Sequence, residues 1–353
     1  MRADPSPPLP AARGPLTEAL LAAWRGSPPA TAGPLPGAPP WAAADGDPDR
    51  DPGTDEDLQL ALYCCNELHY RGFAGVDERW ERHPATTALT TALEDAFEAA
   101  LRAEHRSRPI APDHVERALW ELATADGGPS LSAFVAERAT LEQVRELAVH
   151  RSAYQRKEAD PHSWALPRLS GRAKAALVEI QTDEYGAGVP GESHAELFAE
   201  TMAALDLDPT YGRYLDHLPA VTLATTNLIS LLGRQRRLRG ALVGHLALFE
   251  MTSVGPMGRY AAGLRRLGVG GGRFYEVHVE ADAHHQQVAA HDLAQALVDD
   301  EPHLASDVLF GAAALTAVEA RFSGHILDAW SQGRSSLRPA AGDEVEPVLA
   351  AAS

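Results

Sequence analysis

The stretch FYEVHVEADAHHQQV, residues 274–288, places three histidines and three carboxylates within about a dozen residues. On a helix with about 100° per residue, Asp282 lies about 40° and His285 about 20° from His278. The pattern H-x3-D-x2-H therefore occupies one narrow helix face. A metal site explains this face, but so does a hydrogen-bonded polar cluster or a helix exposed on both sides.

A second candidate ligand is Glu250, which ends the apolar run GALVGHLALFE at residues 240–250. A carboxylate among apolar neighbours needs a partner, or it stays protonated. The alternative is a helix-end glutamate whose carboxylate reaches water. We expect His245, five residues earlier, to be a core or rim histidine.

A third signal is the interrupted helical pattern EIQTDEYGAGVPGESHAELF at residues 179–198. Its glycines and proline predict that one helix ends near Glu184 and that the next begins near Glu192. The break allows Glu184 and His194 to turn toward one point. We expect the competing polar side chains to face away from the site. They are Glu179, Asp183, Glu192 and Glu196 in this stretch, and Glu276, Glu280 and His284 in the opening stretch.

Together with Glu158, in the connection RKEADPHSW, these signals form one set of seven side chains from separate helices. The set consists of four carboxylates and three imidazoles: Glu158, Glu184, Glu250, Asp282, His194, His278 and His285. Four negative charges match two divalent cations, and a shell without thiolate suits iron or manganese better than structural zinc. The sequence contains no Glu-x-x-His motif, which disfavours a ferritin-like di-iron bundle.

Helical spacing of apolar residues continues through most of the chain and predicts an all-α fold. We expect one long helix over 219–253, followed by helices around 260–267 and 273–297. About half of the 26 prolines lie in residues 1–53, which predicts a disordered tail there, with a second tail over 334–353. Between the tails we expect an N-terminal helical part, 54–150, and a core, 151–333.

Composition narrows the possible partners and the location of the protein. The formal net charge of -18 disfavours binding to nucleic acid or to anionic membranes. The sequence predicts neither a secretory signal nor a transmembrane helix. Cys64 and Cys65 lie in an apolar helical run, so we expect core thiols rather than a redox pair. A cytoplasmic protein is the expectation.

These motifs resemble those of a known family, the haem-oxygenase-like di-iron oxidases and oxygenases, often described as iron-containing redox enzymes. The resemblance rests on KEADPHSWALPRLSG, EIQTDEYGAG, a histidine ten residues after Glu184, GALVGHLALFE and HVEADAHH. The helix LQLALYCCNELHYRGFAGVD also resembles the N-terminal part of these proteins. The resemblance as a whole covers roughly residues 55–330. It implies a seven-helix haem-oxygenase-like bundle, with additional N-terminal helices, that binds two non-haem irons and no haem.

By this resemblance, the seven side chains named above are the iron ligands, and Glu184, Glu250 and Asp282 are catalytic carboxylates. Asp160 or His162 is an alternative to Glu158, which lies in a connecting region. The resemblance also implies that the helix over 278–285 loosens without iron, and the preceding glycine run GVGGGR fits this expectation.

The resemblance implies an enzyme that uses O2 and an external reductant to oxidise a small-molecule substrate. We expect N-oxygenation of an amine or amino acid in natural-product biosynthesis. Oxidative C–C or C–N cleavage, or desaturation of an amino or fatty acid, is the alternative within this class. From other classes, a metal-free scaffold or ligand-binding protein remains an alternative, whereas a thiaminase-like enzyme would need a cysteine in the cavity. We expect an electron donor as a partner and a possible homodimer through helices at about 55–105.

Overall fold

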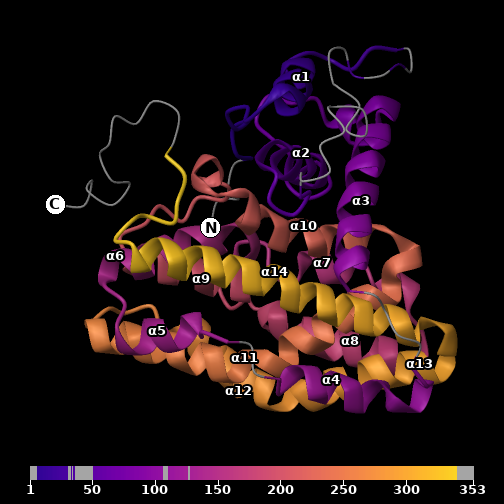
Figure 1. The fold of residues 1–353 in the computed structure, drawn as a ribbon, viewed down its shortest axis with the longest axis vertical. Coiled ribbons are helices and arrows are strands. Elements are labelled where there is room, and N and C mark those ends of the chain that lie inside the picture. The colour runs from indigo at the N-terminus through magenta and orange to yellow at the C-terminus, as the bar shows by residue number, and fades with distance from the viewer. Residues whose placement is uncertain are drawn as a thin grey trace.

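The computed structural model describes residues 6–30, 33, 35, 51–105, 110–125 and 128–339. These residues form helices and no strand, which confirms the all-α prediction. The α-helices are α1 (Pro15–Trp24), α2 (Glu56–Glu67), α3 (Pro84–Glu104), α4 (Val115–Ala123), α5 (Leu131–Glu137), α6 (Leu141–Gln155), α7 (Asp160–Ser163), α8 (Gly171–Glu184), α9 (His194–Ala204), α10 (Ala220–Arg234), α11 (Arg239–Leu267), α12 (Arg273–Gln287), α13 (Ala296–Asp300) and α14 (Ala305–Ser331). Figure 1 shows the long helix α14 crossing the front of the bundle, with α1 and α2 stacked at one end.

The two long helices α11 and α14 pack against each other through two glycines. A Cβ atom on Gly244 of α11 would lie 1.8 Å from the Val308 carbonyl oxygen, and one on Gly311 of α14 would lie 1.8 Å from that of Ala241. Only glycine permits so close an approach of two helix backbones. Helix α12 also packs along α11. The contacts of α11 with α14 and α12 therefore fix the positions of Glu250, on α11, and of the opening motif, on α12.

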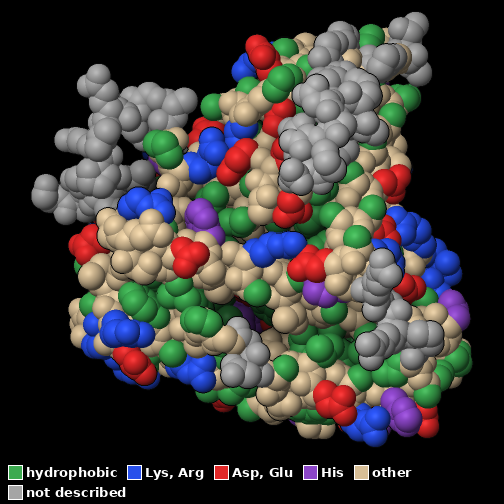
Figure 2. Space-filling model, viewed as in Figure 1, with side chains coloured by type: hydrophobic (Ala, Val, Ile, Leu, Met, Phe, Trp, Pro, Cys, Tyr) green, Lys and Arg blue, Asp and Glu red, His purple; other side chains and the backbone are tan. Residues whose placement is uncertain are grey.

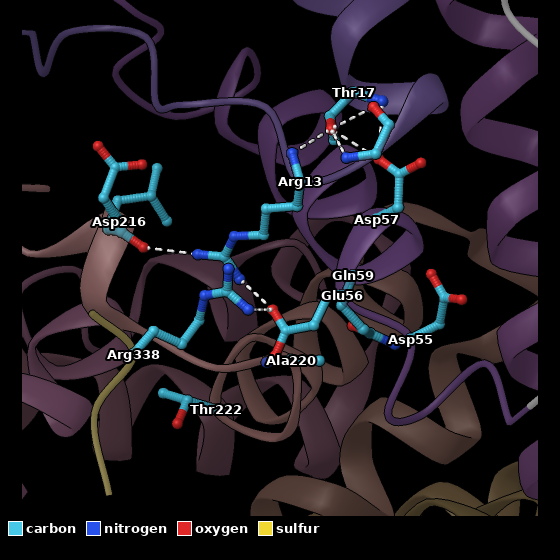
Figure 3. Close-up of polar contacts among 12 residues, drawn as sticks. Arg13, Thr17, Asp55, Glu56, Asp57, Gln59, Asp216, Ala220, Thr222 and Arg338 are labelled. Atoms are coloured by element: carbon cyan, nitrogen blue, oxygen red, sulfur yellow. Dashed lines mark hydrogen bonds and ion pairs between the residues drawn. The ribbon is translucent and has the colours of Figure 1, made fainter. Parts of the chain in front are cut away.

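Part of the segment predicted to be a disordered tail, residues 1–53, is a helix packed on the bundle. Helix α1 buries Leu16, Leu20, Leu21 and Trp24. Its first turn is fixed by Asp57 of α2, whose carboxylate accepts hydrogen bonds from the backbone N–H groups of Leu16 and Thr17 at 2.8 Å. Figure 3 shows Asp57 beside Thr17. The tail prediction is therefore wrong for residues 15–24, because an apolar helix face outweighs the proline-rich composition around it. Residues 6–14 and 25–30 of this predicted tail also contact the bundle: Ala11 N donates to Asp216 at 2.8 Å, and Trp80 Nε1 donates to the Gly26 carbonyl at 2.8 Å. Residues 1–5, 31–32, 34 and 36–50 lie outside the described residues.

Glu56 at the start of α2 connects the two ends of the described chain. Its carboxylate lies 2.7 Å from Arg13 and 2.9 Å from Arg338 (Figure 3). Nearby, the Ser336 hydroxyl donates to the buried Glu146 carboxylate at 2.7 Å. Residues 334–339 are thus ordered against the bundle, in contrast to the predicted tail, while 340–353 lie outside the described residues.

Two predicted helix boundaries also differ from the structure. The predicted helix over 219–253 is two helices, because the backbone at Gln235 is extended and ends α10. Helix α11 then continues without interruption to Leu267, past Pro256. Helix α6 runs through the expected division between residues 150 and 151, so no linker separates the two parts there.

Both cysteines belong to the core of the bundle. Cys64 and Cys65 are free and fully buried in α2, as predicted for core thiols. Among the helices that the structure describes, none has the length and hydrophobicity needed to cross a membrane. On the face shown in Figure 2, Lys and Arg side chains lie in several separate places with Asp and Glu near them.

Candidate metal centre

The seven predicted ligands meet inside the bundle. Glu158 lies in the turn between α6 and α7, Glu184 ends α8, and His194 begins α9. Glu250 comes from α11, and the remaining three come from one face of α12. All seven side chains are buried: Glu158, Glu184, His194, Glu250, His278, Asp282 and His285. Four separate segments and α12 thus deliver these side chains to the interior of the bundle.

The first group contains Glu158, Glu184, His194 and His278, which each offer one ligand atom within 4.8 Å of the others. His194 Nδ1 lies 3.0 Å from Glu184 Oε2, and His278 Nε2 lies 3.7 Å from Glu158 Oε1. His194 Nδ1, His278 Nε2 and Glu158 Oε2 are nevertheless buried without a hydrogen-bond partner. Such atoms are costly unless an ion or a water satisfies them.

The second group contains Glu250, Asp282 and His285, again with ligand atoms within 4.8 Å of one another. His285 Nδ1 lies 3.4 Å from Glu250 and 3.6 Å from Asp282. His285 Nδ1 and Asp282 Oδ1 are buried without a hydrogen-bond partner. The other Asp282 oxygen accepts a hydrogen bond from Ser253 at 2.5 Å. One oxygen is thus held by the protein, and the other is left for a cation.

Hydrogen bonds fix two of the three histidines with one ring nitrogen directed at the site. Nδ1 of His278 donates to the Phe274 carbonyl at 2.6 Å, which leaves Nε2 facing Glu158. Nε2 of His285 lies 3.0 Å from the Asp183 carboxylate, which leaves Nδ1 facing Glu250 and Asp282. Metal-ligating histidines usually have their second nitrogen held in this way.

Asp183 and Ser253 are therefore site residues that the sequence interpretation missed. Asp183 was expected to be solvated, and its side chain is indeed 53% exposed. The sequence shows that Asp183 lies one residue before Glu184. It does not show which helix packs against α8, so the contact with His285 could not be predicted. Ser253 lies three residues after Glu250, on the same side of α11, and only the packing of α12 reveals its partner.

The loop between α8 and α9 explains why Glu184 and His194 converge. Gly186 has φ +61, and a Cβ atom there would lie 2.4 Å from the backbone of Glu192. The two ends of the loop therefore approach each other more closely than a side chain at this position allows. At the far end, Glu196 accepts hydrogen bonds from Gly191 N at 3.0 Å and Ser193 Oγ at 2.7 Å. The predicted helix break is confirmed.

Glu158 occupies its place in the first group because the neighbouring backbone is held on both sides. Ala159 has φ +72, an unfavourable conformation for a residue with a side chain. Its carbonyl accepts a hydrogen bond from the Gln181 amide at 3.0 Å. The two suggested alternatives to Glu158 are engaged elsewhere: Asp160 accepts from Tyr185 at 2.8 Å, and His162 Nε2 lies 3.2 Å from His245 Nδ1.

Three of the polar residues expected to face away from the site are exposed on the outer faces of α8 and α12. His284 is exposed and lies 2.8 Å from Glu179, and Glu280 is exposed. His245 is buried in the core beside His162. The division of α12 into an inner and an outer face is thus the one that helical periodicity predicts.

Burial and the contacts among the charged groups of the cluster shift their pKa values. Burial raises the pKa of Glu250 to about 8, although the His285 imidazole opposes the rise. Burial acts to lower the pKa of both α12 histidines, but the neighbouring carboxylates outweigh it. Glu158 raises the pKa of His278 to about 10, and Asp282 with Glu250 raises that of His285 to about 11. Metal binding would replace these protons.

A divalent metal pair fits this donor set. The five unpartnered donor atoms named above all belong to predicted ligands and face the interior of one or the other group. They are carboxylate oxygens and imidazole nitrogens, which suit iron or manganese. Between the groups lies a small cavity of about 10 Å³, lined in part by Tyr154, Leu246 and Phe249. This volume is about the size that one water molecule needs.

The comparison with known proteins agrees with this geometry. A family model described as iron-containing redox enzyme matches residues 145–320, which include all seven predicted ligands. Over these residues the chain belongs to the iron-containing redox enzyme family. A nitrosourea synthase from Streptomyces achromogenes subsp. streptozoticus is 28% identical over 145 residues, which is 40% of this chain and 31% of that relative. The chain thus matches about a third of the relative's length.

Proposed function

We propose that this protein is a non-haem di-iron oxygenase that uses O2 to oxidise a nitrogen atom of a small amine or amino acid. The observation that carries the proposal is the pair of buried ligand groups with five unpartnered donor atoms. Membership in an iron-containing redox family supports iron as the metal. The similarity to a nitrosourea synthase supports oxidation at nitrogen, because a nitrosourea carries oxygen bonded to nitrogen.

Each group would hold one iron. Glu158, Glu184, His194 and His278 would bind the first, and Glu250, Asp282 and His285 would bind the second. The four carboxylates balance the charge of two divalent ions. Bound iron supplies the redox chemistry with O2 that side chains cannot supply, and an external reductant would return it to the ferrous state.

The protein itself would contribute orientation and exclusion of water. Asp183 holds His285, and the Phe274 carbonyl holds His278, so both imidazoles are oriented before a metal binds. Phe249 and Leu246 make part of the cavity wall apolar. A low local dielectric strengthens every electrostatic interaction inside the site.

The proposal is tested by anaerobic loading of the full chain with Fe(II) and counting the iron bound. We expect two irons per chain, and one after either His194→Ala or Asp282→Ala. If both variants keep two irons, the ligand set is wrong, and if the native chain binds none, the di-iron assignment fails. Incorporation of label from 18O2 then distinguishes the reactions: oxygen retained on nitrogen supports the proposal, whereas an unlabelled desaturated or cleaved product contradicts it.

A further inference from the structure

A cleft at the surface leads toward the metal centre. It has a volume of about 590 Å³, within the usual range for a small-molecule site. Its walls come from the end of α8, the loop between α8 and α9, the start of α9 and the outer side of α12. The central cavity between the ligand groups is far smaller, at about 10 Å³. A substrate larger than a few atoms therefore fits the cleft and not the closed cavity.

The cleft is lined by one member of the first ligand group and by a residue that holds a member of the second. His194, a member of the first group, lines it, is 4% exposed and has an unpartnered Nδ1. Asp183 also lines it and holds His285 of the second group at 3.0 Å. A molecule in this cleft thus lies against one residue from the first group and one residue that holds the second.

The charged side chains that line the cleft are acidic. They are Asp183, Glu192 and Glu280, and among the described lining residues none is Lys or Arg. Asp183 is engaged with His285, and Glu192 forms an ion pair with Arg273. Glu280 forms no hydrogen bond or ion pair within the described part of the chain, so its carboxylate is the one free to bind a cation.

The remaining lining is apolar and includes Val189, Leu197 and Val277. Val189 is 52% exposed, which is unusual among the large hydrophobic residues that the structure describes. An apolar wall beside a free carboxylate matches a ligand with a positive charge and a short hydrocarbon chain. It disfavours a carboxylate-bearing ligand, since like charges repel.

We propose that this cleft is the substrate entrance and that Glu280 selects a cationic amine or guanidine with an apolar chain. This inference rests on the proposed function, because it takes the ligand groups as the oxidising centre. It narrows the substrate to a cation and argues against a fatty acid. Glu280 is a specificity residue in this scheme, since it lies on the outer side of α12 and is not a metal ligand.

The test uses two probes of equal chain length and opposite charge, hexylamine and hexanoate. Their binding to the full chain is measured by calorimetry at low ionic strength under nitrogen, with and without Fe(II). We expect hexylamine to bind at least about tenfold more tightly than hexanoate, and the difference to shrink as salt is added. Equal affinity, tighter binding of hexanoate, or binding of neither probe would overturn the proposal.

A matched pair of variants locates the binding site. Glu280→Gln should weaken hexylamine binding by about threefold or more. Glu276→Gln removes the same charge from the same helix, also two residues from His278, but Glu276 pairs with Arg265 at 3.1 Å and does not line the cleft. It should bind hexylamine as the native chain does. If both variants lose affinity equally, Glu280 has no special role and the inference is wrong.

The test of the cleft and the test of the di-iron centre can fail independently of each other. The metal-free titration contains neither iron nor O2, so it reports on the cleft alone. Binding of hexylamine by a chain that takes up no iron would contradict the di-iron oxygenase and leave the cleft as a cation site. Two bound irons without hexylamine binding would contradict the cleft and leave the metal centre intact.

Discussion

Lys157 Nζ lies 2.8 Å from the Glu67 carboxylate, and both side chains are fully buried. Tyr211 donates to the same carboxylate at 2.7 Å, and the Lys157 ammonium lies over the rings of Tyr63 and Tyr70. Lys157 directly precedes Glu158, a candidate metal ligand, whereas Glu67 is in α2, outside the segment matched by the family model. An N-terminal helix thus anchors the turn that carries one wall of the metal centre.

Glu67→Gln should therefore destabilise the protein and weaken the first ligand group. Removal of one partner leaves a buried charge uncompensated, which costs about 3–5 kcal/mol. Denaturant unfolding measures the loss of stability, and Fe(II) titration measures binding. The double variant Glu67→Gln with Lys157→Met removes both charges and should recover part of the stability. If it is less stable than Glu67→Gln alone, the ion pair is not what holds this turn.

Asp183→Asn should weaken metal binding at the second group by about 10- to 100-fold, because His285 loses the carboxylate that orients its ring. Glu179→Gln is the matched control, since Glu179 is also on α8 and contacts a histidine of α12, the exposed His284. It should bind both metals normally. Competitive Fe(II) titration of the two variants checks this, and equal affinities would contradict the role of Asp183.

The close packing of α11 on α14 predicts opposite effects for two glycines of α14. Gly311→Ala would place Cβ 1.8 Å from the Ala241 carbonyl oxygen and should cost about 1–3 kcal/mol or more of stability. A Cβ atom on Gly324 would instead meet no neighbouring atom within 4 Å. Gly324→Ala should raise stability by up to about 1 kcal/mol, because alanine favours the helix. Thermal unfolding of both variants tests the pair, and a destabilised Gly324→Ala would contradict the argument.

Much of the metal centre was predictable because its residues obey local rules. The face of α12 follows from helical periodicity, and the convergence of Glu184 with His194 follows from the glycines between them. Glu158 lies in an irregular turn with Ala159 at positive φ, so no periodicity marks it, and only the family resemblance identified it. Asp183 and Ser253 depend on which helices face each other, which no local pattern specifies.

The errors in the fold have a similar origin. Helix α1 was missed because the proline content was averaged over residues 1–53. Within that segment, residues 15–24 have an apolar helix face of their own. The break at Gln235 was missed because no glycine or proline stands between Arg234 and Arg239. There the Arg168 guanidinium donates to the carbonyls of Gly233 and Arg234 at the end of α10. Helix α10 packs on α2 and α14, whereas α11 packs mainly on α14 and α12, so packing overrides the helical preference of that segment.

His150 predicts how stability depends on pH at a position remote from the seven ligands. It is 1% exposed, and its ring nitrogens lie 2.7 Å from Thr222 Oγ1 and 3.0 Å from Ser336 Oγ. Burial lowers its pKa from 6.5 to about 3. Between these values the unfolded chain binds a proton that the folded protein excludes.

The contribution of His150 to stability is therefore complete above about pH 6.5 and is lost as the pH falls toward 3, at about 1.4 kcal/mol per pH unit. Urea unfolding at several pH values between 4 and 7 measures this slope. His150→Gln keeps a hydrogen-bonding side chain without a titrating group, so its stability should fall less steeply with acid. His284→Gln alters an exposed histidine and should keep the native slope. If His150→Gln shows the native slope as well, other groups cause the acid sensitivity, and His150 is not excluded from protonation by its burial.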